Sequence, residues 1–114
     1  MTDCLFCAIA AGDIPADVVY RDDDVLAFRD ISPQAPVHVL VIPRAHFANA
    51  ADLAAADPAL AGRLLVVAGA IAAQEGVAES GYRLVTNTGA GAGQSVDHVH
   101  FHLLGGRSLS WPPG

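Results

Sequence analysis

Short hydrophobic runs separated by turn residues follow one another along this chain. Several runs are rich in valine, leucine and aromatic residues and are bounded by aspartate, proline or glycine, a pattern typical of β-strands. Asp22-Asp23-Asp24, between the first two runs, predicts a hairpin connection, and Pro43 predicts the end of the third run. The predicted strands cover residues 18–21, 25–29, 38–42, 82–87 and 98–104.

The longest helical pattern lies in the second half of the chain. Asp57 followed by Pro58 is an N-cap with proline at the first helical position. The pattern runs to about Gln74, and Gly76 is placed to end the helix. Apolar residues at helical spacing predict a buried stripe on this helix. The expected stripe comprises Leu60, Leu64, Val67, Ala68 and Ile71.

The two ends of the chain are expected to differ in structure. A short helix is predicted over residues 4–11, capped by Thr2 or Asp3 and stopped at Gly12. The closing residues Trp111-Pro112-Pro113-Gly114 are not expected to form regular structure, because two prolines remove two backbone donors.

The last predicted strand carries three histidines at strict alternation. Successive side chains of a strand point to opposite faces, so His98, His100 and His102 are expected to share one face. The apolar residues between them are expected to face the core. Because histidine can accept or donate a proton near neutral pH, the row predicts a site for a ligand such as a phosphate group.

Composition narrows the class of protein. With 114 residues the chain is expected to form one domain, residues 1–114. Hydrophobic residues make up 53% and charged residues 16%, which predicts that a homodimer covers some apolar surface. A net charge of −6 argues against a nucleic-acid polymer as partner. No stretch has the pattern of a membrane span or a leader peptide, so a cytoplasmic protein with no membrane partner is expected.

Three further features are compatible with nucleotide chemistry. The glycine-rich residues 88–95 let backbone amides approach a phosphate, although a merely flexible loop has the same composition. Asp30 ends a predicted strand, where its carboxylate could accept hydrogen bonds from the hydroxyls of a ribose or could cap a turn. His38 opens the third strand and could join the histidine row or be structural.

Cys4 and Cys7 are too close in sequence to join distant parts of the chain. They are interpreted as metal ligands, a redox pair or ordinary helix residues. With His46 and one histidine of the row they would complete a Cys2His2 set of the kind that binds zinc.

Together these residues resemble the histidine-triad (HIT) family. The segment His98-Val99-His100-Phe101-His102-Leu103-Leu104 matches its signature of alternating histidine and apolar residues, and Gly93-Gln94-Ser95 matches the loop before it. The resemblance implies an α+β, HIT-like fold with a five-stranded antiparallel sheet, one long helix, a short N-terminal helix and a sheet that extends across a homodimer. Motifs that resemble the Hint branch are Asp30-Ile31-Ser32-Pro33-Gln34-Ala35-Pro36, His38 with Val41-Ile42-Pro43, Gly81-Tyr82-Arg83 and Trp111-Pro112-Pro113-Gly114.

The resemblance implies a purine nucleoside phosphoramidase, which hydrolyses the P–N bond of adenosine or guanosine 5'-phosphoramidates to the nucleoside monophosphate. His100 would be the nucleophile and would form a nucleotidyl-histidine intermediate. His98 would orient His100, while His102 and His38 would stabilise charge on the phosphate oxygens. No cofactor would be required for catalysis.

The same resemblance assigns the rest of the pocket. Ser95 would take part in catalysis and in phosphate binding. Residues 105–114 would form a C-terminal tail that contributes to the dimer and to the active site. The residues implied in nucleotide binding are Phe6, Ile9, Phe28 and Ile31 at the base, Asp30 at the ribose, Asn87, Gly93, Gln94 and Ser95 at the phosphate or leaving group, and Trp111 from the partner.

The spacing Cys4-Leu5-Phe6-Cys7 resembles bacterial HIT proteins that bind zinc. The implied ligands are Cys4, Cys7, His46 and His98. The zinc would be structural, because four protein ligands leave no open position for a substrate.

Two other functions fit the residues by spacing alone. A zinc-dependent hydrolase or hydratase would bind catalytic zinc through two histidines of the row and His38. A nucleotide-binding regulatory protein would bind nucleoside monophosphates tightly with negligible turnover. Hydrolysis of dinucleoside polyphosphates, typical of the neighbouring Fhit branch, is less favoured by the Hint-like tail.

Overall fold

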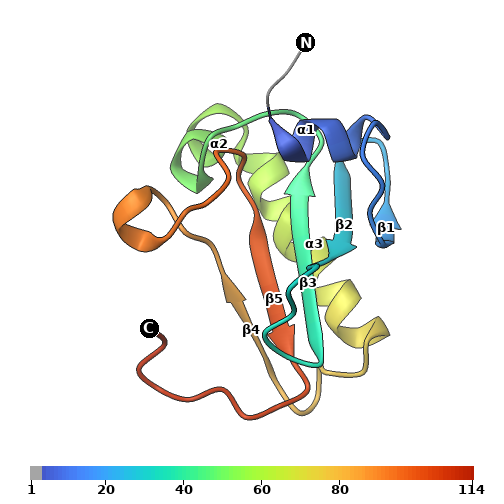
Figure 1. The fold of residues 1–114 in the computed structure, drawn as a ribbon, viewed down its shortest axis with the longest axis vertical. Helices are drawn as coiled ribbons and strands as arrows, with labels where there is room; N and C mark the ends of the chain where they lie inside the picture. The colour runs from blue at the N-terminus through green and yellow to red at the C-terminus, as the bar shows by residue number, and fades with distance from the viewer. Residues whose placement is uncertain (1–3) are drawn as a thin grey trace.

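The computed structural model describes residues 4–114 and has a five-stranded antiparallel sheet at its centre (Figure 1). The strand order is β1-β2-β3-β5-β4, so the two strands that carry the histidines, β3 and β5, lie side by side. The α+β architecture with five antiparallel strands is therefore confirmed. The strands are β1 (Val18–Arg21), β2 (Val25–Arg29), β3 (Val37–Pro43), β4 (Tyr82–Val85) and β5 (Phe101–Gly105).

The long helix α3 (Pro58–Gln74) covers the face of the sheet that lies at the back in Figure 1. Its predicted N-cap is confirmed, since Asp57 accepts a hydrogen bond from the Leu60 N–H at 3.1 Å. At the other end Gly76 has φ of 78° and lets the chain turn away from the helix. The buried residues of α3 are Leu64, Val67, Ala68, Ile71 and Ala72, and Leu60 packs partly buried against the same core.

The short helix α1 (Leu5–Ala10) lies across the front of the sheet at its upper end (Figure 1). It is one residue shorter at each end than predicted. Its N-cap is Cys4, whose Sγ accepts a hydrogen bond from the Cys7 N–H at 3.3 Å, and the expected caps Thr2 and Asp3 lie outside the described residues. Phe6 is the buried residue of α1 and packs on the front of the sheet.

The two faces of the sheet have separate cores because alternate residues of each strand face opposite sides. On β2, Val25 and Ala27 belong to the back core under α3, whereas Leu26 and Phe28 belong to the front core under α1. The same parity divides β3. Both cores are apolar there, so the alternation is invisible in the sequence of these two strands.

The histidine strand begins later than predicted. The pattern predicted a strand over residues 98–104, but β5 begins at Phe101, because the preceding segment bonds outside the sheet. The Val99 N–H donates to the Phe47 carbonyl at 2.7 Å, and the Thr86 hydroxyl donates to the His100 carbonyl at 2.9 Å. The neighbouring β4 likewise ends at Val85, two residues earlier than predicted.

Two elements were not predicted. Helix α2 (Ala50–Ala56) buries Leu53 alone, so its alanine-rich sequence carries no apolar stripe that would indicate a helix. A short 3-10 helix, η1 (Ala90–Ala92), lies inside the glycine-rich loop. Among residues 4–114, no helix has both the length and the apolar character needed to cross a bilayer.

Candidate active site

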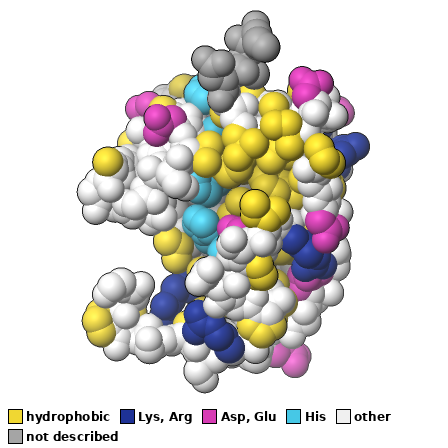
Figure 2. Space-filling model, viewed as in Figure 1, with side chains coloured by type: hydrophobic (Ala, Val, Ile, Leu, Met, Phe, Trp, Pro, Cys, Tyr) yellow, Lys and Arg dark blue, Asp and Glu magenta, His cyan; other side chains and the backbone are white. Residues whose placement is uncertain are grey.

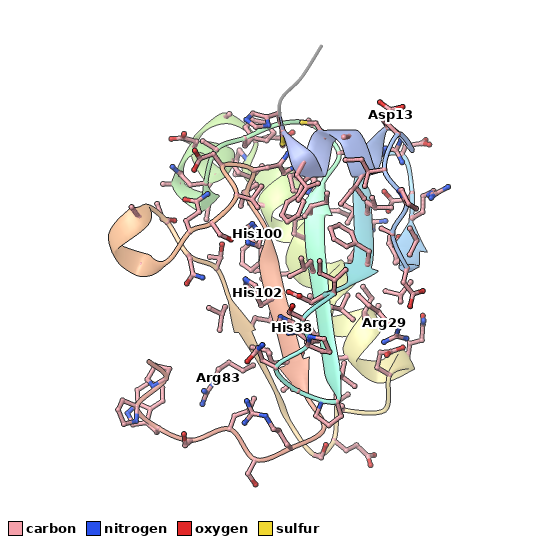
Figure 3. The ribbon with its side chains drawn as sticks, in the orientation of Figure 1. Asp13, Arg29, His38, Arg83, His100 and His102 are labelled. Atoms are coloured by element: carbon pink, nitrogen blue, oxygen red, sulfur yellow. The ribbon has the colours of Figure 1, made fainter. Side chains whose placement is uncertain are left out.

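The histidine row lies on the front of the sheet, as the alternation predicted. Val99 and Leu103 are buried in the back core and Phe101 packs against it, so the histidines point the other way. The rings of His100 and His102 have centroids 5.0 Å apart. Figure 2 shows the histidines as a row beside a broad apolar surface, and Figure 3 shows that His38 lies next in line.

His38 and His102 form a hydrogen-bonded pair whose proton positions follow from the backbone. The Gln34 N–H donates to His38 Nδ1 at 3.0 Å, so this nitrogen carries no proton. The proton of neutral His38 is therefore on Nε2, which lies 2.9 Å from His102 Nδ1 and donates to it. His102 then carries its own proton on Nε2 and can donate it to a ligand.

Burial keeps this pair neutral. Burial lowers the pKa of His38, although the Asp30 carboxylate, 3.4 Å from His38 Nε2, acts in the opposite direction. Burial, with the neighbouring His100 and His38, lowers the pKa of His102 to about 4. Near neutral pH both rings are thus uncharged, and the hydrogen bond from His38 Nε2 to His102 Nδ1 is present.

His100 has the opposite proton arrangement. Its Nδ1 lies 2.9 Å from the His98 carbonyl, which can only accept, so in the neutral ring Nδ1 carries the proton and Nε2 has the free lone pair. His98 thus contacts the His100 ring through its backbone carbonyl, which accepts the hydrogen bond from Nδ1. The arrangement leaves a nucleophilic nitrogen beside the donor on His102.

His98 faces the cysteines rather than the pocket. Its side chain is fully buried, and its Nε2 donates to the Pro43 carbonyl at 2.8 Å. The lone pair of Nδ1 is therefore directed at Cys4 Sγ, 3.3 Å away, and Cys7 Sγ, 3.4 Å away. Burial lowers the pKa of His98, which favours the neutral form that ligates metals.

The four predicted zinc ligands converge, with all their ligand atoms within 4.8 Å of one another. Cys7 Sγ lies 3.3 Å from His46 Nδ1, and the two contacts to His98 Nδ1 are 3.3 and 3.4 Å long. Tetrahedral zinc with ordinary bond lengths would separate sulfur and nitrogen by about 3.6 Å. The Pro43 carbonyl orients the buried histidine as an outer partner should. The residues present thus fit a Cys2His2 zinc site.

A pocket of about 280 Å³ lies between the histidines and α1. His100 and His102 form one wall. Asp30 caps a turn, since one carboxylate oxygen accepts from the Ser32 N–H at 2.8 Å, and its other oxygen lies 3.4 Å from His38 Nε2. Of the residues implied in nucleotide binding, Phe6, Ile9, Phe28, Asp30, Ile31 and Ser95 line this pocket.

The remaining predicted residues lie outside the pocket lining. The Gln94 side chain donates to the Ala48 and Val96 carbonyls, at 2.6 and 3.0 Å, and accepts from the Gly89 N–H. Gln94 therefore shapes the loop. Trp111 is 80% exposed in the C-terminal tail, away from this pocket. The pocket also does not include Asn87, Gly93 or His38.

Several pocket residues were missed. Leu40 pairs with His102 across β3 and β5, so its parity with His38 would have placed it on the same face. The others had no chemical signal in the sequence, because their role depends on which loop and helix cover the sheet. The additional lining residues are Leu5, Pro15, Ala16, Arg29, Leu40 and Val96.

The ligand set of a three-histidine catalytic zinc does not assemble as spacing suggested. The group that converges is Asp30, His38 and His102, without His100. In neutral His38 the proton occupies Nε2, the nitrogen that faces the other two residues. A metal there would require an imidazolate, so the hydrogen bond from the Gln34 N–H disfavours this alternative.

Known proteins are similar to this chain in both sequence and fold. The HIT domain profile matches residues 11–109. The chain is 59% identical over 112 residues to an uncharacterized HIT-like protein of Synechococcus elongatus, covering 98% of this chain and 97% of that protein. It is 51% identical over 107 residues to the purine nucleoside phosphoramidase of Escherichia coli K12, covering 94% and 90%. A crystal structure of a HIT family hydrolase from Legionella pneumophila superposes with a TM-score of 0.95 at 54% identity, covering 98% of this chain and all of that one. The chain therefore belongs to the HIT domain family.

Proposed function

We propose that this protein is a purine nucleoside phosphoramidase. As a HIT-type nucleotide hydrolase it acts on a nucleotide, and the proposal adds that the bond cleaved is the P–N bond of an adenosine or guanosine 5'-phosphoramidate. One observation carries the proposal: the unprotonated Nε2 of His100 stands beside His102, whose Nε2 carries a proton, on the wall of one pocket. The relative from Escherichia coli supports the choice of substrate.

The proton positions suggest how each histidine acts. His100 Nε2 attacks phosphorus, an N–P bond forms, and the bond to the leaving nitrogen breaks, while that nitrogen takes a proton from solvent and departs as the neutral amine. The Nε2–H of His102 donates to an oxygen of the phosphate, where negative charge develops. His38 keeps His102 in this tautomer through Nδ1. Water then cleaves the nucleotidyl-histidine, and the nucleoside monophosphate leaves.

The pocket lining suggests how the nucleotide lies. Phe6 and Phe28, with ring centroids 5.5 Å apart, form an apolar floor suited to a purine. Asp30 has an oxygen available for the ribose hydroxyls between this floor and the histidines. Ser95 is placed near the phosphate end. Gly93, Gln94 and Asn87 would contribute through the loop around it.

Zinc is proposed as a structural ion. Cys4, Cys7, His46 and His98 would hold it and so connect α1 to the segment that precedes His100. When bound, the ion would supply cross-linking rather than reaction chemistry, because four ligands leave no open position. Catalysis is proposed to need no cofactor.

The protein is proposed to act as a homodimer, with 1–114 as one domain. The outer side of α3 exposes Leu65 and Val66, which are 51% and 64% exposed, and β4 is an edge strand that could continue the sheet in a second copy. Trp111, in the tail 105–114, would then reach the partner's pocket. The cytoplasmic location stays a prediction.

The test is intact-protein mass spectrometry after rapid quenching with an adenosine 5'-phosphoramidate, on wild type and His100→Ala. An added nucleotidyl mass in wild type alone, insensitive to a chelator, would support the proposal. Absence of adduct and turnover from every sample would refute it. Tight monophosphate binding with negligible turnover would instead indicate a nucleotide-binding regulator.

A further inference from the structure

A chain of hydrogen bonds connects the C-terminal tail to the histidine pair. Arg107 follows β5, and its Nε donates to the Gln34 carbonyl at 2.9 Å. The N–H of the same Gln34 donates to His38 Nδ1 at 3.0 Å, and His38 Nε2 lies 2.9 Å from His102 Nδ1. Arg107 is thus linked to His102 through Gln34 and His38, although it lies outside the pocket.

The loop that carries Gln34 is held by local hydrogen bonds and by the buried side chain of Ala35. Its own bonds are local: the Ser32 N–H donates to Asp30 at 2.8 Å, and the Gln34 side chain donates to the Ser32 carbonyl at 2.9 Å. Ser32 and Gln34 are exposed and lie in no helix or strand. The guanidinium of Arg107 adds a charge-assisted bond at the residue whose N–H faces His38.

The tail is shaped to make this contact. Gly106 has φ of +88°, and a Cβ on it would lie 2.9 Å from Pro36 Cβ, so only glycine lets the tail pass this close to the loop. Among the described residues, none of the ion pairs involves Arg107. Its bonds go to backbone carbonyls, those of Gln34 and Ser108. Its charge therefore acts on the loop backbone.

We infer that Arg107 is a positioning residue that holds Gln34 against His38 and so maintains the proton arrangement of the His38–His102 pair. Without Arg107 the loop can move, and His38 Nδ1 loses its donor for part of the time. His38 then also populates the tautomer with the proton on Nδ1, whose bare Nε2 cannot donate to His102. His102 in turn no longer keeps its proton on the nitrogen that faces substrate. The inference rests on the proposed function for its kinetic consequence only.

Arg83 offers a matched control. Its Nη2 donates to the Ser110 and Leu109 carbonyls, at 2.9 and 3.5 Å, so it holds the same tail without touching Gln34. Arg83 is a residue of β4, and Figure 3 shows its side chain apart from His38. Arg83→Gln therefore releases part of the tail and leaves the Gln34 contact in place, whereas Arg107→Gln removes that contact. Arg107 is exposed, so neither the fold nor the core depends on it.

The experiment is two-bond proton–nitrogen NMR of the histidine rings at about pH 8, where imidazoles are neutral, together with kcat and KM for an adenosine 5'-phosphoramidate. Wild type should show His38 as a single tautomer protonated on Nε2. Arg107→Gln should show both tautomers, and kcat should fall about fivefold with little change in KM. Arg83→Gln should keep the wild-type His38 signals.

Two results would overturn the inference: wild-type His38 signals in Arg107→Gln, or the same tautomer change in Arg83→Gln, which would assign the effect to tail release. The proposed function fails separately. If wild type does not hydrolyse the phosphoramidate, the function is refuted, while the NMR signals still decide whether Arg107 controls the His38 tautomer.

Discussion

His98 and His102 lie on the same face of one short segment, yet their hydrogen-bond partners differ. His98 is fully buried, bonded to the Pro43 carbonyl and turned toward two thiols. His102 forms part of the pocket wall and is bonded to another histidine. The first environment suits a metal ligand and the second a proton donor to phosphate.

The difference teaches that neighbours, rather than position in the row, decide what each histidine does. A backbone carbonyl fixes the proton on Nε2 of His98 but on Nδ1 of His100, two residues later. The Gln34 N–H donates to Nδ1 of His38 and so places the proton of that ring on Nε2, as in His98. In each of these three rings one peptide group therefore determines which nitrogen is unprotonated.

The largest effect is expected from removing His100, the proposed nucleophile. His100→Ala should lower kcat by about four orders of magnitude, because no other group on the wall offers an unprotonated nitrogen in its place. Steady-state kinetics measure the loss, and near-wild-type affinity for nucleoside monophosphate shows that the pocket persists. Retention of a tenth of the activity would contradict this role.

Removing a cysteine of the proposed zinc site should lower stability rather than kcat. Cys7→Ser should lower the free energy of unfolding of the zinc-loaded protein by about 3 kcal/mol, because a structural ion no longer joins α1 to the His98 segment. Urea denaturation with and without chelator measures it. Ser95→Ala, at the pocket, should respond to chelator as wild type does. If chelator leaves the free energy of unfolding of the wild type unchanged, the structural zinc is ruled out.

Lowering the pH should destabilise the folded protein through His102. Its pKa is lowered to about 4 from an ordinary 6.5, so between these values the unfolded chain binds a proton that the folded chain does not. Stability therefore falls as pH falls through this window. Relative to His102→Gln, wild type should lose about 2 kcal/mol between about pH 7.5 and about pH 4.5, measured by denaturation at both values. Parallel losses in both proteins would contradict the shifted pKa.

The smallest effect is expected at the open rim. Ile31 is 99% exposed and lines the pocket, so it gains contacts only when a base covers it. Ile31→Ser should weaken nucleotide binding about fivefold and leave the free energy of unfolding within about 0.5 kcal/mol. Titration calorimetry and denaturation test the two halves. Unchanged affinity would place the base elsewhere.

Much of the fold followed from pattern. The five strands, α3 and its capping by Asp57 were predictable because strand alternation and helix caps are local properties. Helix α2 was not, since it buries a single leucine. The start of β5 was not either, because the bonds that divert residues 98–100 come from Phe47 and Thr86, distant in sequence.

By itself the sequence determined which residues face the front of the sheet, and, through its motifs, the family and the two sets of reactive side chains. Tertiary structure alone decided the proton position on the rings of His98, His38 and His100. The partners that decide it are peptide groups of Pro43, Gln34 and His98, and every residue carries such groups whatever its side chain. Folding selects which of them meets an imidazole, and that choice distinguishes the proposed metal ligand, the proposed nucleophile and the proposed proton donor.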